Sequence, residues 1–146
     1  MLRFLFFILF GSVSMLQAQW ALVSTNMTST TFAGAMRMEQ IDGTFYLCGV
    51  QSGLFTSPDA VVWTRVSNGL PRTTAGGFTI YGAVRGVVKF NGKLYALANG
   101  AGSVTGGTFV KMPSDTVWTK LSNGLSGTSL SGTSIIALDD RILITT

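Results

Sequence analysis

The sequence predicts an all-β chain made of repeated units of four short antiparallel strands. Three observations support this fold class. A ten-residue segment occurs twice, a hairpin pattern occurs three times, and no stretch after the N-terminal segment combines helical periodicity with helix caps.

The ten-residue segment reads "VWTRVSNGLP" at residues 62–71 and "VWTKLSNGLS" at residues 117–126, with seven of ten positions identical. Two of the three differences conserve residue type, because Arg65 is matched by Lys120 and a valine by a leucine. We interpret each copy as the last strand of a unit followed by its exit turn. The glycine of "SNGL" supplies the positive φ that such a turn needs.

A hairpin pattern recurs with spacings of 49 and 48 residues. Three segments align without gaps: "QIDGTFYLCG" (40–49), "KFNGKLYALA" (89–98) and "ALDDRILITT" (137–146). Each places a turn pair between two apolar runs, and the pairs are Asp42-Gly43, Asn91-Gly92 and Asp139-Asp140. Asp-Gly and Asn-Gly favour the type I′ turn of a two-residue hairpin. The pattern therefore predicts three β-hairpins, and it assigns Asp139-Asp140 to a turn in preference to a calcium site.

Each complete unit is predicted to contain four strands. They fall at 36–41, 44–50, 54–57 and 61–67 in the first unit, and at 84–90, 93–98, 108–111 and 116–122 in the second. Four antiparallel strands in about 50 residues is the period of a β-propeller blade. The sequence thus predicts an incomplete β-propeller with blades at 35–70 and 83–125 and the start of a truncated blade at 133–146. An immunoglobulin-like sandwich is the alternative, although it does not require a unit to recur.

The first 19 residues have the layout of a secretory signal peptide. Arg3 precedes an apolar run at 4–10, and small and polar residues surround Ala18. The run is much shorter than the roughly 20 residues that cross a bilayer. We expect the signal peptide to be cleaved after Ala18 or Gln19. The mature chain is then expected to be secreted or to reside in the cell envelope, without a stable membrane span.

Residues 20–27 read "WALVSTNM" and match the start of the repeated segment, so they predict an isolated outer strand that could complete a last blade. A blade buries its faces only against its neighbours, and two whole units with two partial ones do not complete a ring. We therefore expect residues 20–146 to be the N-terminal part of a longer propeller.

Composition excludes several functional classes. The chain has no histidine, which removes Ser-His-Asp and Cys-His catalysis and most transition-metal sites, and no cofactor or metal is expected. A net charge of +4 without a basic cluster does not indicate nucleic-acid binding. Cys48 is the only cysteine, so no intrachain disulfide can form. Its place in an apolar strand predicts a buried thiol that acts as a small hydrophobe.

The segments "GLFTSPDAVVWTRVSNGLP" and "GTFVKMPSDTVWTKLSNGL" resemble the Asp-box (BNR) repeats of sialidase-like and sortilin-like β-propellers. The family pattern is Ser/Thr, any, Asp, any, Gly, any, Thr/Ser, Trp. The first segment lacks one residue and the Gly of this pattern, whereas the second fits more closely. The resemblance implies a structural turn, in which the aspartate caps backbone groups and the tryptophan packs into the blade. The residues concerned are Ser57, Asp59 and Trp63 in the first segment and Ser114, Asp115 and Trp118 in the second.

The candidate ligand-binding residues are Arg37, Glu39 and Arg85. They lie on the predicted first strands, which line the central channel of a propeller, although salt-bridged or solvated channel residues are the alternative. Glu39 is the only glutamate, so the carboxylate pair of a glycosidase is not evident, and no catalytic residue is assigned. The glycine-rich segment "NGAGSVTGG" (99–107) predicts a long hairpin loop that could bind a ligand.

From these features we expect an exported, non-catalytic module that binds or scaffolds a protein or glycan surface. Two alternatives remain open at this point. The chain could be the N-terminal part of a sialidase-like glycoside hydrolase whose other blades supply the active site. It could also be an assembly-factor propeller.

Overall fold

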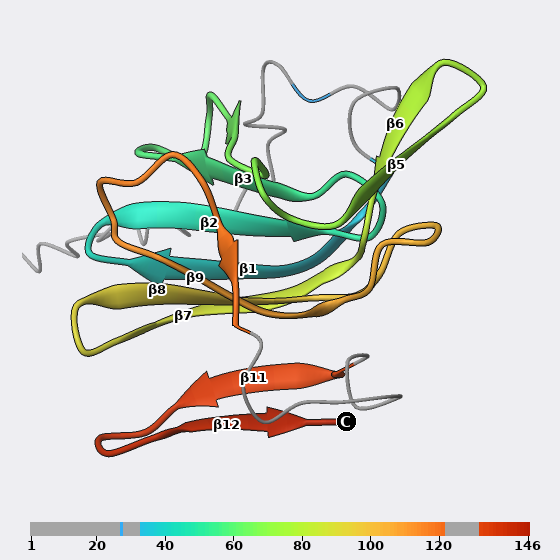
Figure 1. Cartoon of the computed structure of the whole chain (residues 1–146). Coiled ribbons are helices and arrows are strands. Elements are labelled where there is room, and N and C mark those ends of the chain that lie inside the picture. Colours follow the sequence, from blue (N-terminus) through green and yellow to red (C-terminus); the bar gives the residue numbers. More distant parts are fainter. Residues whose placement is uncertain (1–26, 28–32, 122–131) are drawn as a thin grey trace, which may run out of the picture.

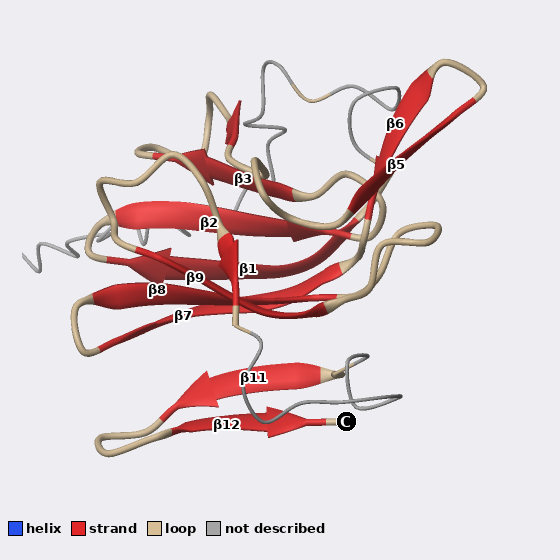
Figure 2. Cartoon of the chain, in the orientation of Figure 1, coloured by secondary structure: helices blue, strands red, loops and turns tan. Residues whose placement is uncertain are grey.

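A computed structural model describes residue 27, residues 33–121 and residues 132–146. The predicted signal peptide (1–19), nearly all of the predicted outer strand (20–27) and the second copy of "SNGL" (122–125) lie outside these residues. The described part of the chain is all-β and contains no helix (Figure 2). It consequently offers no helix that is long and apolar enough to span a membrane.

Two four-stranded antiparallel sheets follow each other along the chain, each with its strands paired in sequence order. The first sheet comprises β1 (Ala35–Ile41), β2 (Thr44–Gly49), β3 (Leu54–Ser57) and β4 (Thr64–Arg65). The second comprises β7 (Val84–Phe90), β8 (Lys93–Ala98), β9 (Gly107–Lys111) and β10 (Thr119–Lys120). The four-stranded antiparallel units predicted from the repeats are therefore present.

The fourth strand of each sheet is shorter than predicted. The predicted strands at 61–67 and 116–122 are reduced to two residues each, β4 and β10. In the first sheet the residues before β4 form a turn closed by the Asp59 carboxylate. After Val66 the chain leaves the sheet because the Ser67 hydroxyl bonds both backbone groups of Leu54, accepting from its N–H at 2.8 Å and donating to its carbonyl at 3.1 Å.

All three predicted hairpins form. Asp42 (φ 48°) and Gly43 (φ 78°) make the first turn, and Asn91 (φ 47°) and Gly92 (φ 74°) the second, with both residues at positive φ as a type I′ turn requires. The third hairpin joins β11 (Ser134–Ala137) to β12 (Ile142–Thr145). Neither residue of its Asp139-Asp140 pair has a positive φ. The strand pairing stops at Ala137 and Ile142, and across the pair the Leu138 amide donates to the Arg141 carbonyl at 2.8 Å. Without glycine at the second turn position, the left-handed conformation carries a steric cost.

A fourth hairpin lies between the two sheets and was not predicted. It consists of β5 (Arg72–Ala75) and β6 (Phe78–Tyr81), joined by Gly76 (φ 58°) and Gly77 (φ 82°). Figure 1 shows that it projects from the rest of the molecule. A Gly-Gly pair between two runs that contain Thr, Ile, Phe and Tyr is a recognised hairpin signal, so the sequence did carry this information.

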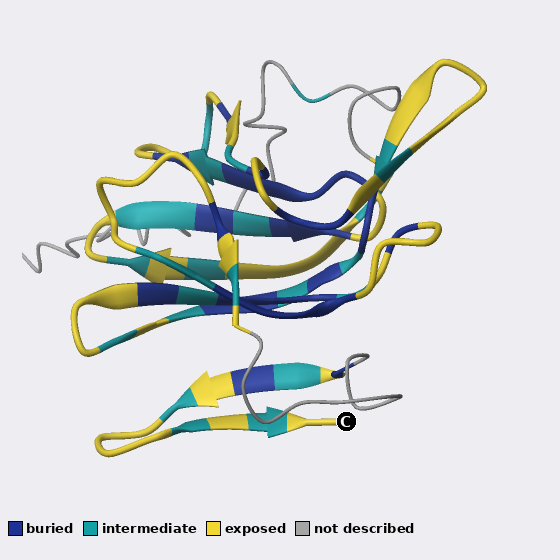
Figure 3. Cartoon of the chain, viewed as in Figure 1, coloured by how far each residue is buried: buried dark blue, intermediate teal, exposed yellow. Residues whose placement is uncertain are grey.

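The sheets stack through their first strands. β1 and β2 pack against β7, and β7 in turn packs against β11, so β7 lies between the other two first strands (Figure 1). The main core lies between the first and second sheets, as the buried segments of Figure 3 show. It consists of Tyr46, Cys48, Leu54, Leu70, Val84, Val87, Leu94, Ala96, Ala98, Phe109 and Trp118. Within the described residues the stack is open and does not close into a ring.

The repeated ten-residue segment accounts for part of this stacking. The exit turn of the first copy receives the tryptophan of the second: the Trp118 amide donates to the Asn68 carbonyl at 2.8 Å, and its indole Nε1 donates to the Val66 carbonyl at 2.8 Å. Gly69 (φ 90°) lies so close that a Cβ there would come within 2.1 Å of the Trp118 carbonyl oxygen. The two copies therefore form one interface between consecutive sheets.

Candidate functional site

The first strands of the two sheets carry the same irregularity at the same place. The pairing of β1 with β2 is interrupted between Ala35 and Arg37, and that of β7 with β8 between Val84 and Gly86. The bulged residues, Met36 and Arg85, are 49 residues apart and thus equivalent in the repeat. Bulges re-aim side chains and are frequent beside binding sites. Here they bring the two side chains together, since Arg85 Nη1 lies 3.6 Å from Met36 Sδ.

Arg85 is partly buried and is held by an amide. With its oxygen turned toward the guanidinium, Asn99 accepts from Arg85 Nε at 3.2 Å and from Nη2 at 2.9 Å, while its own nitrogen donates to the Gly132 carbonyl at 3.2 Å. The ion pairs found among the described residues do not include Arg85. The guanidinium is therefore held in one orientation, and no carboxylate among the described residues neutralises its charge. A planar, oriented guanidinium of this kind can bind a carboxylate or another oxyanion through two hydrogen bonds.

The other two predicted ligand contacts, Arg37 and Glu39, bind each other. They lie on one face of β1, and Arg37 Nε forms an ion pair with the Glu39 carboxylate. Arg37 Nη1 also lies 3.5 Å from the Ser134 hydroxyl on β11. For this pair the structure matches the alternative interpretation of salt-bridged residues. Of the three candidates, only Arg85 is in no ion pair with a described acidic side chain.

A cavity of about 350 Å³ adjoins the Arg85 site through Asn99. Its walls come from the β2–β3 loop, the β6–β7 connection and the start of the glycine-rich β8–β9 loop. The residues that line it are Val50, Gln51, Ile80, Tyr81, Gly82, Ala83, Asn99, Gly100, Ala101 and Gly102. As predicted, the segment 99–107 connects two paired strands. Asn99 therefore belongs both to the arginine site and to the cavity wall.

Sequence reasoning missed Met36 and Asn99. Met36 could have been found, because the gapless alignment of the repeats places it opposite Arg85. Asn99 lies 14 residues after Arg85 in a loop, and no local pattern indicates that the two side chains meet.

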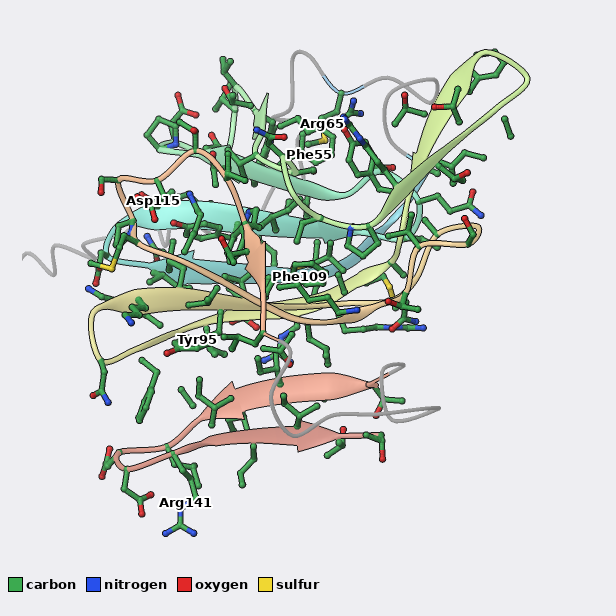
Figure 4. All side chains as sticks on the ribbon, in the orientation of Figure 1. Phe55, Arg65, Tyr95, Phe109, Asp115 and Arg141 are labelled. Atoms are coloured by element: carbon green, nitrogen blue, oxygen red, sulfur yellow. The ribbon has the colours of Figure 1, made fainter. Side chains whose placement is uncertain are left out.

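The aspartates of the Asp-box-like segments serve their own turns. Asp59 Oδ1 accepts from the Ser57 hydroxyl and the Val61 amide, both at 2.8 Å, and from the Val62 amide at 3.2 Å. Asp115, labelled in Figure 4, accepts from the Met112 amide at 3.0 Å. In the first turn Ala60, directly after the aspartate, takes a positive φ of 61°. Both carboxylates are therefore occupied by local hydrogen bonds.

The Asp59 turn predicts an acid-dependent loss of stability. The backbone amide of Val61, the Ser57 hydroxyl and the Val62 amide lower the Asp59 pKa below its value in an unfolded chain. A carboxyl with a lowered folded-state pKa stabilises the fold above its unfolded pKa and loses that contribution as the pH falls through the folded one. Asp59→Asn should thus flatten the decline in thermal stability below about pH 4. Melting curves of both proteins from acid to neutral pH would show this, and parallel declines would contradict it.

Cys48 is fully buried in the core, as predicted for a small hydrophobe. Burial, with a smaller effect from the Glu39 carboxylate, raises the pKa of its thiol to about 12. Because the thiolate is the nucleophile, the native thiol should resist alkylation at neutral pH. Iodoacetamide followed by mass spectrometry should give no adduct within the time that labels the urea-unfolded chain completely. Equal labelling of both forms would show that Cys48 is accessible.

Arg65 binds two aromatic rings and is a structural residue in this arrangement. Its guanidinium carbon lies 4.9 Å from the ring centre of Phe55 and 5.3 Å from that of Tyr81. Figure 4 labels Arg65 and Phe55 next to each other. These contacts join β4 and β3 to the end of β6. Cation–π contacts of this kind contribute on the order of 0.5–2 kcal/mol. Arg65 thus helps to attach the projecting hairpin to the first sheet.

The described residues contain no group of three or more Cys, Asp or Glu side chains that could hold a metal ion. Their only glutamate is paired with Arg37, and Asp59 and Asp115 are engaged in turns. The site can therefore offer an oriented cation, an amide and a small cavity to a ligand.

Comparison of the chain with protein-family models, curated proteins and solved structures gave no match.

Proposed function

We propose that this chain is an exported, non-catalytic repeat module of β-propeller type, and that it binds an acidic group of a protein or glycan at the bulged ends of its first strands. The observation that carries the proposal is Arg85: partly buried, oriented by Asn99 and without a carboxylate partner among the described residues. Placing an unneutralised guanidinium in a partly buried position costs solvation energy, which an incoming oxyanion offsets.

The propeller-type architecture is supported by the way the repeats pack. Consecutive four-stranded sheets meet through their first strands, and the exit turn of one sheet receives the tryptophan of the next. The Asp59 and Asp115 turns also make the capping contacts that the Asp-box resemblance implies. Export is proposed from the leader sequence at residues 1–19. The intact mass of the exported form should correspond to a chain that begins at Gln19 or Trp20.

Binding is tested by presenting the chain to arrays of carboxylated, sulfated and neutral glycans and of acidic peptides. We expect acidic ligands to be retained and Arg85→Gln to weaken their binding by roughly 10-fold or more, as befits the loss of a charged hydrogen bond. Lys93→Gln is the matched control, because it removes one positive charge from the exposed end of β8 and leaves the site intact.

Two outcomes would overturn the proposal. One is that Arg85→Gln and Lys93→Gln weaken ligand binding equally, which would mean that Arg85 acts only through the net charge of the chain. The other is a wild-type chain that retains neutral ligands as well as acidic ones.

A further inference from the structure

Met36 lies against the charged group of the candidate site. It is the bulged residue of β1, and its Sδ is 3.6 Å from Arg85 Nη1. A thioether sulfur is only a weak hydrogen-bond acceptor, so this contact leaves the Nη1 hydrogens with little of the bonding that they could make. Met36 is also 41% exposed, so small molecules in solution can reach its side chain.

The Asn99 amide determines which edge of the Arg85 guanidinium remains available. Its oxygen accepts from Nε and from Nη2, so the remaining donors are those of Nη1 and the second hydrogen of Nη2. Two parallel hydrogen bonds from an edge of this kind are the arrangement in which arginine binds a carboxylate. An acidic ligand of Arg85 would therefore use the same Nη1 that Met36 contacts.

We propose that Met36 is a modification site, at which oxidation of the thioether to the sulfoxide by a peroxide blocks anion binding at Arg85. In this reaction a sulfur lone pair attacks one peroxide oxygen and the O–O bond breaks. The sulfur gains that oxygen and loses two electrons, while the proton of the transferred oxygen passes to the other oxygen, which leaves as water or an alcohol. The effect on ligand binding rests on the function proposed above, whereas the modification and its contact with Arg85 do not.

The sulfoxide would bind Arg85 more strongly than the thioether does. Its oxygen is a strong acceptor because the S–O bond is polarised toward oxygen. Since the sulfur is already 3.6 Å from Nη1, an oxygen bonded to it can come within the roughly 2.7–3.2 Å of an ordinary hydrogen bond. Hydrogen bonds from a charged donor are roughly twice as strong as neutral ones. Oxidised Met36 would thus occupy Nη1 from within the chain.

Two other methionines provide the comparison. Met38 is 55% exposed and Met112 is 44% exposed, so a peroxide should reach them as well. Among the described residues neither sulfur has an arginine contact like that of Met36. Cys48, the only cysteine, is fully buried and is not expected to compete for the peroxide. An effect of oxidation that depends on Met36 alone is therefore attributable to its contact with Arg85.

The contact is tested on the full chain without a ligand. Hydrogen peroxide is added until peptide mapping shows Met36 as the sulfoxide. Nuclear magnetic resonance then follows the guanidinium N–H signals of Arg85, which the Arg85→Lys variant identifies by their absence. We expect oxidation to slow proton exchange at these groups by about 10-fold or more in the wild type and to leave it unchanged in Met36→Leu. Unchanged exchange in the oxidised wild type would overturn the proposal.

Binding to the carboxylated glycans and acidic peptides of the arrays is the second measurement. Peroxide should weaken it by about 10-fold or more in the wild type and in Met38→Leu, but should have no effect on Met36→Leu. Methionine sulfoxide reductase should then restore binding. Equal weakening of the wild type and Met36→Leu would overturn the proposal. Slowed exchange at Arg85 in a chain that binds no acidic ligand even before oxidation would support the modification and overturn the function proposed above.

Discussion

Replacing Gly69 by alanine is expected to destabilise the chain by about 2–5 kcal/mol, from the combined cost of a left-handed backbone and a displaced neighbour. Gly69 has a φ of 90°, and a Cβ there would lie 2.1 Å from the carbonyl oxygen of Trp118 and 2.9 Å from its amide nitrogen. Because both are backbone atoms, the contact can be relieved only by moving the second sheet away from the exit turn of the first. Urea unfolding measures the loss directly.

Gly43→Ala separates these two causes. Gly43 has a φ of 78°, but an added Cβ would meet nothing within 4 Å, so only the backbone strain of about 1–2 kcal/mol applies. The difference between the two variants is the contribution of the close approach to Trp118. Equal costs for Gly69→Ala and Gly43→Ala would mean that the exit turn does not receive the second sheet.

Replacing Trp118 by alanine should cost about 3–5 kcal/mol, the usual range for a buried tryptophan. Trp118 is buried in the core between the two sheets, and its ring also lies under Lys111, whose Nζ is 5.4 Å from the ring centre. Denaturant unfolding followed by circular dichroism gives the free energy. Val117→Ala, at an exposed neighbouring position, should stay within about 0.5 kcal/mol of the wild type.

Trp118→Phe tests the hydrogen bond within the same site. Phenylalanine keeps most of the apolar surface but cannot donate to the Val66 carbonyl, which the indole reaches at 2.8 Å. An unsatisfied buried acceptor costs about 1–3 kcal/mol, so this variant should lie between the wild type and Trp118→Ala. A phenylalanine variant as stable as the wild type would show that the indole N–H makes no such bond.

Local turn chemistry explains which parts of the fold could be predicted. Asp42-Gly43 and Asn91-Gly92 determine a two-residue turn, and the strands on either side follow from it. The third turn differs because neither aspartate has a positive φ, and the strand pairing there stops one residue earlier on each side, at Ala137 and Ile142. The fourth strand of the first sheet was overestimated because the Asp59 turn before it and the Ser67 hydroxyl after it use backbone groups that a longer strand would pair.

The candidate site was predictable only in part, because its geometry depends on contacts between distant residues. Alternation along β1 places Arg37 and Glu39 on one face, so their ion pair is a local consequence of the strand. The partners of Arg85 come from elsewhere: Met36 from the preceding sheet and Asn99 from a glycine-rich loop. The equivalence of Met36 and Arg85 is visible in the repeat, but the bulge that turns both side chains toward each other is not.

The repeated decapeptide joins consecutive sheets, with the exit turn of one holding the tryptophan of the next. Hydrogen exchange followed by nuclear magnetic resonance tests it at two protons, the Trp118 amide and its indole Nε1–H, which donate to Asn68 and Val66. Both should exchange as slowly as the amides of β8 in the core. If both exchange as fast as the amides of the exposed Gly76-Gly77 turn, the two sheets are not joined in this way.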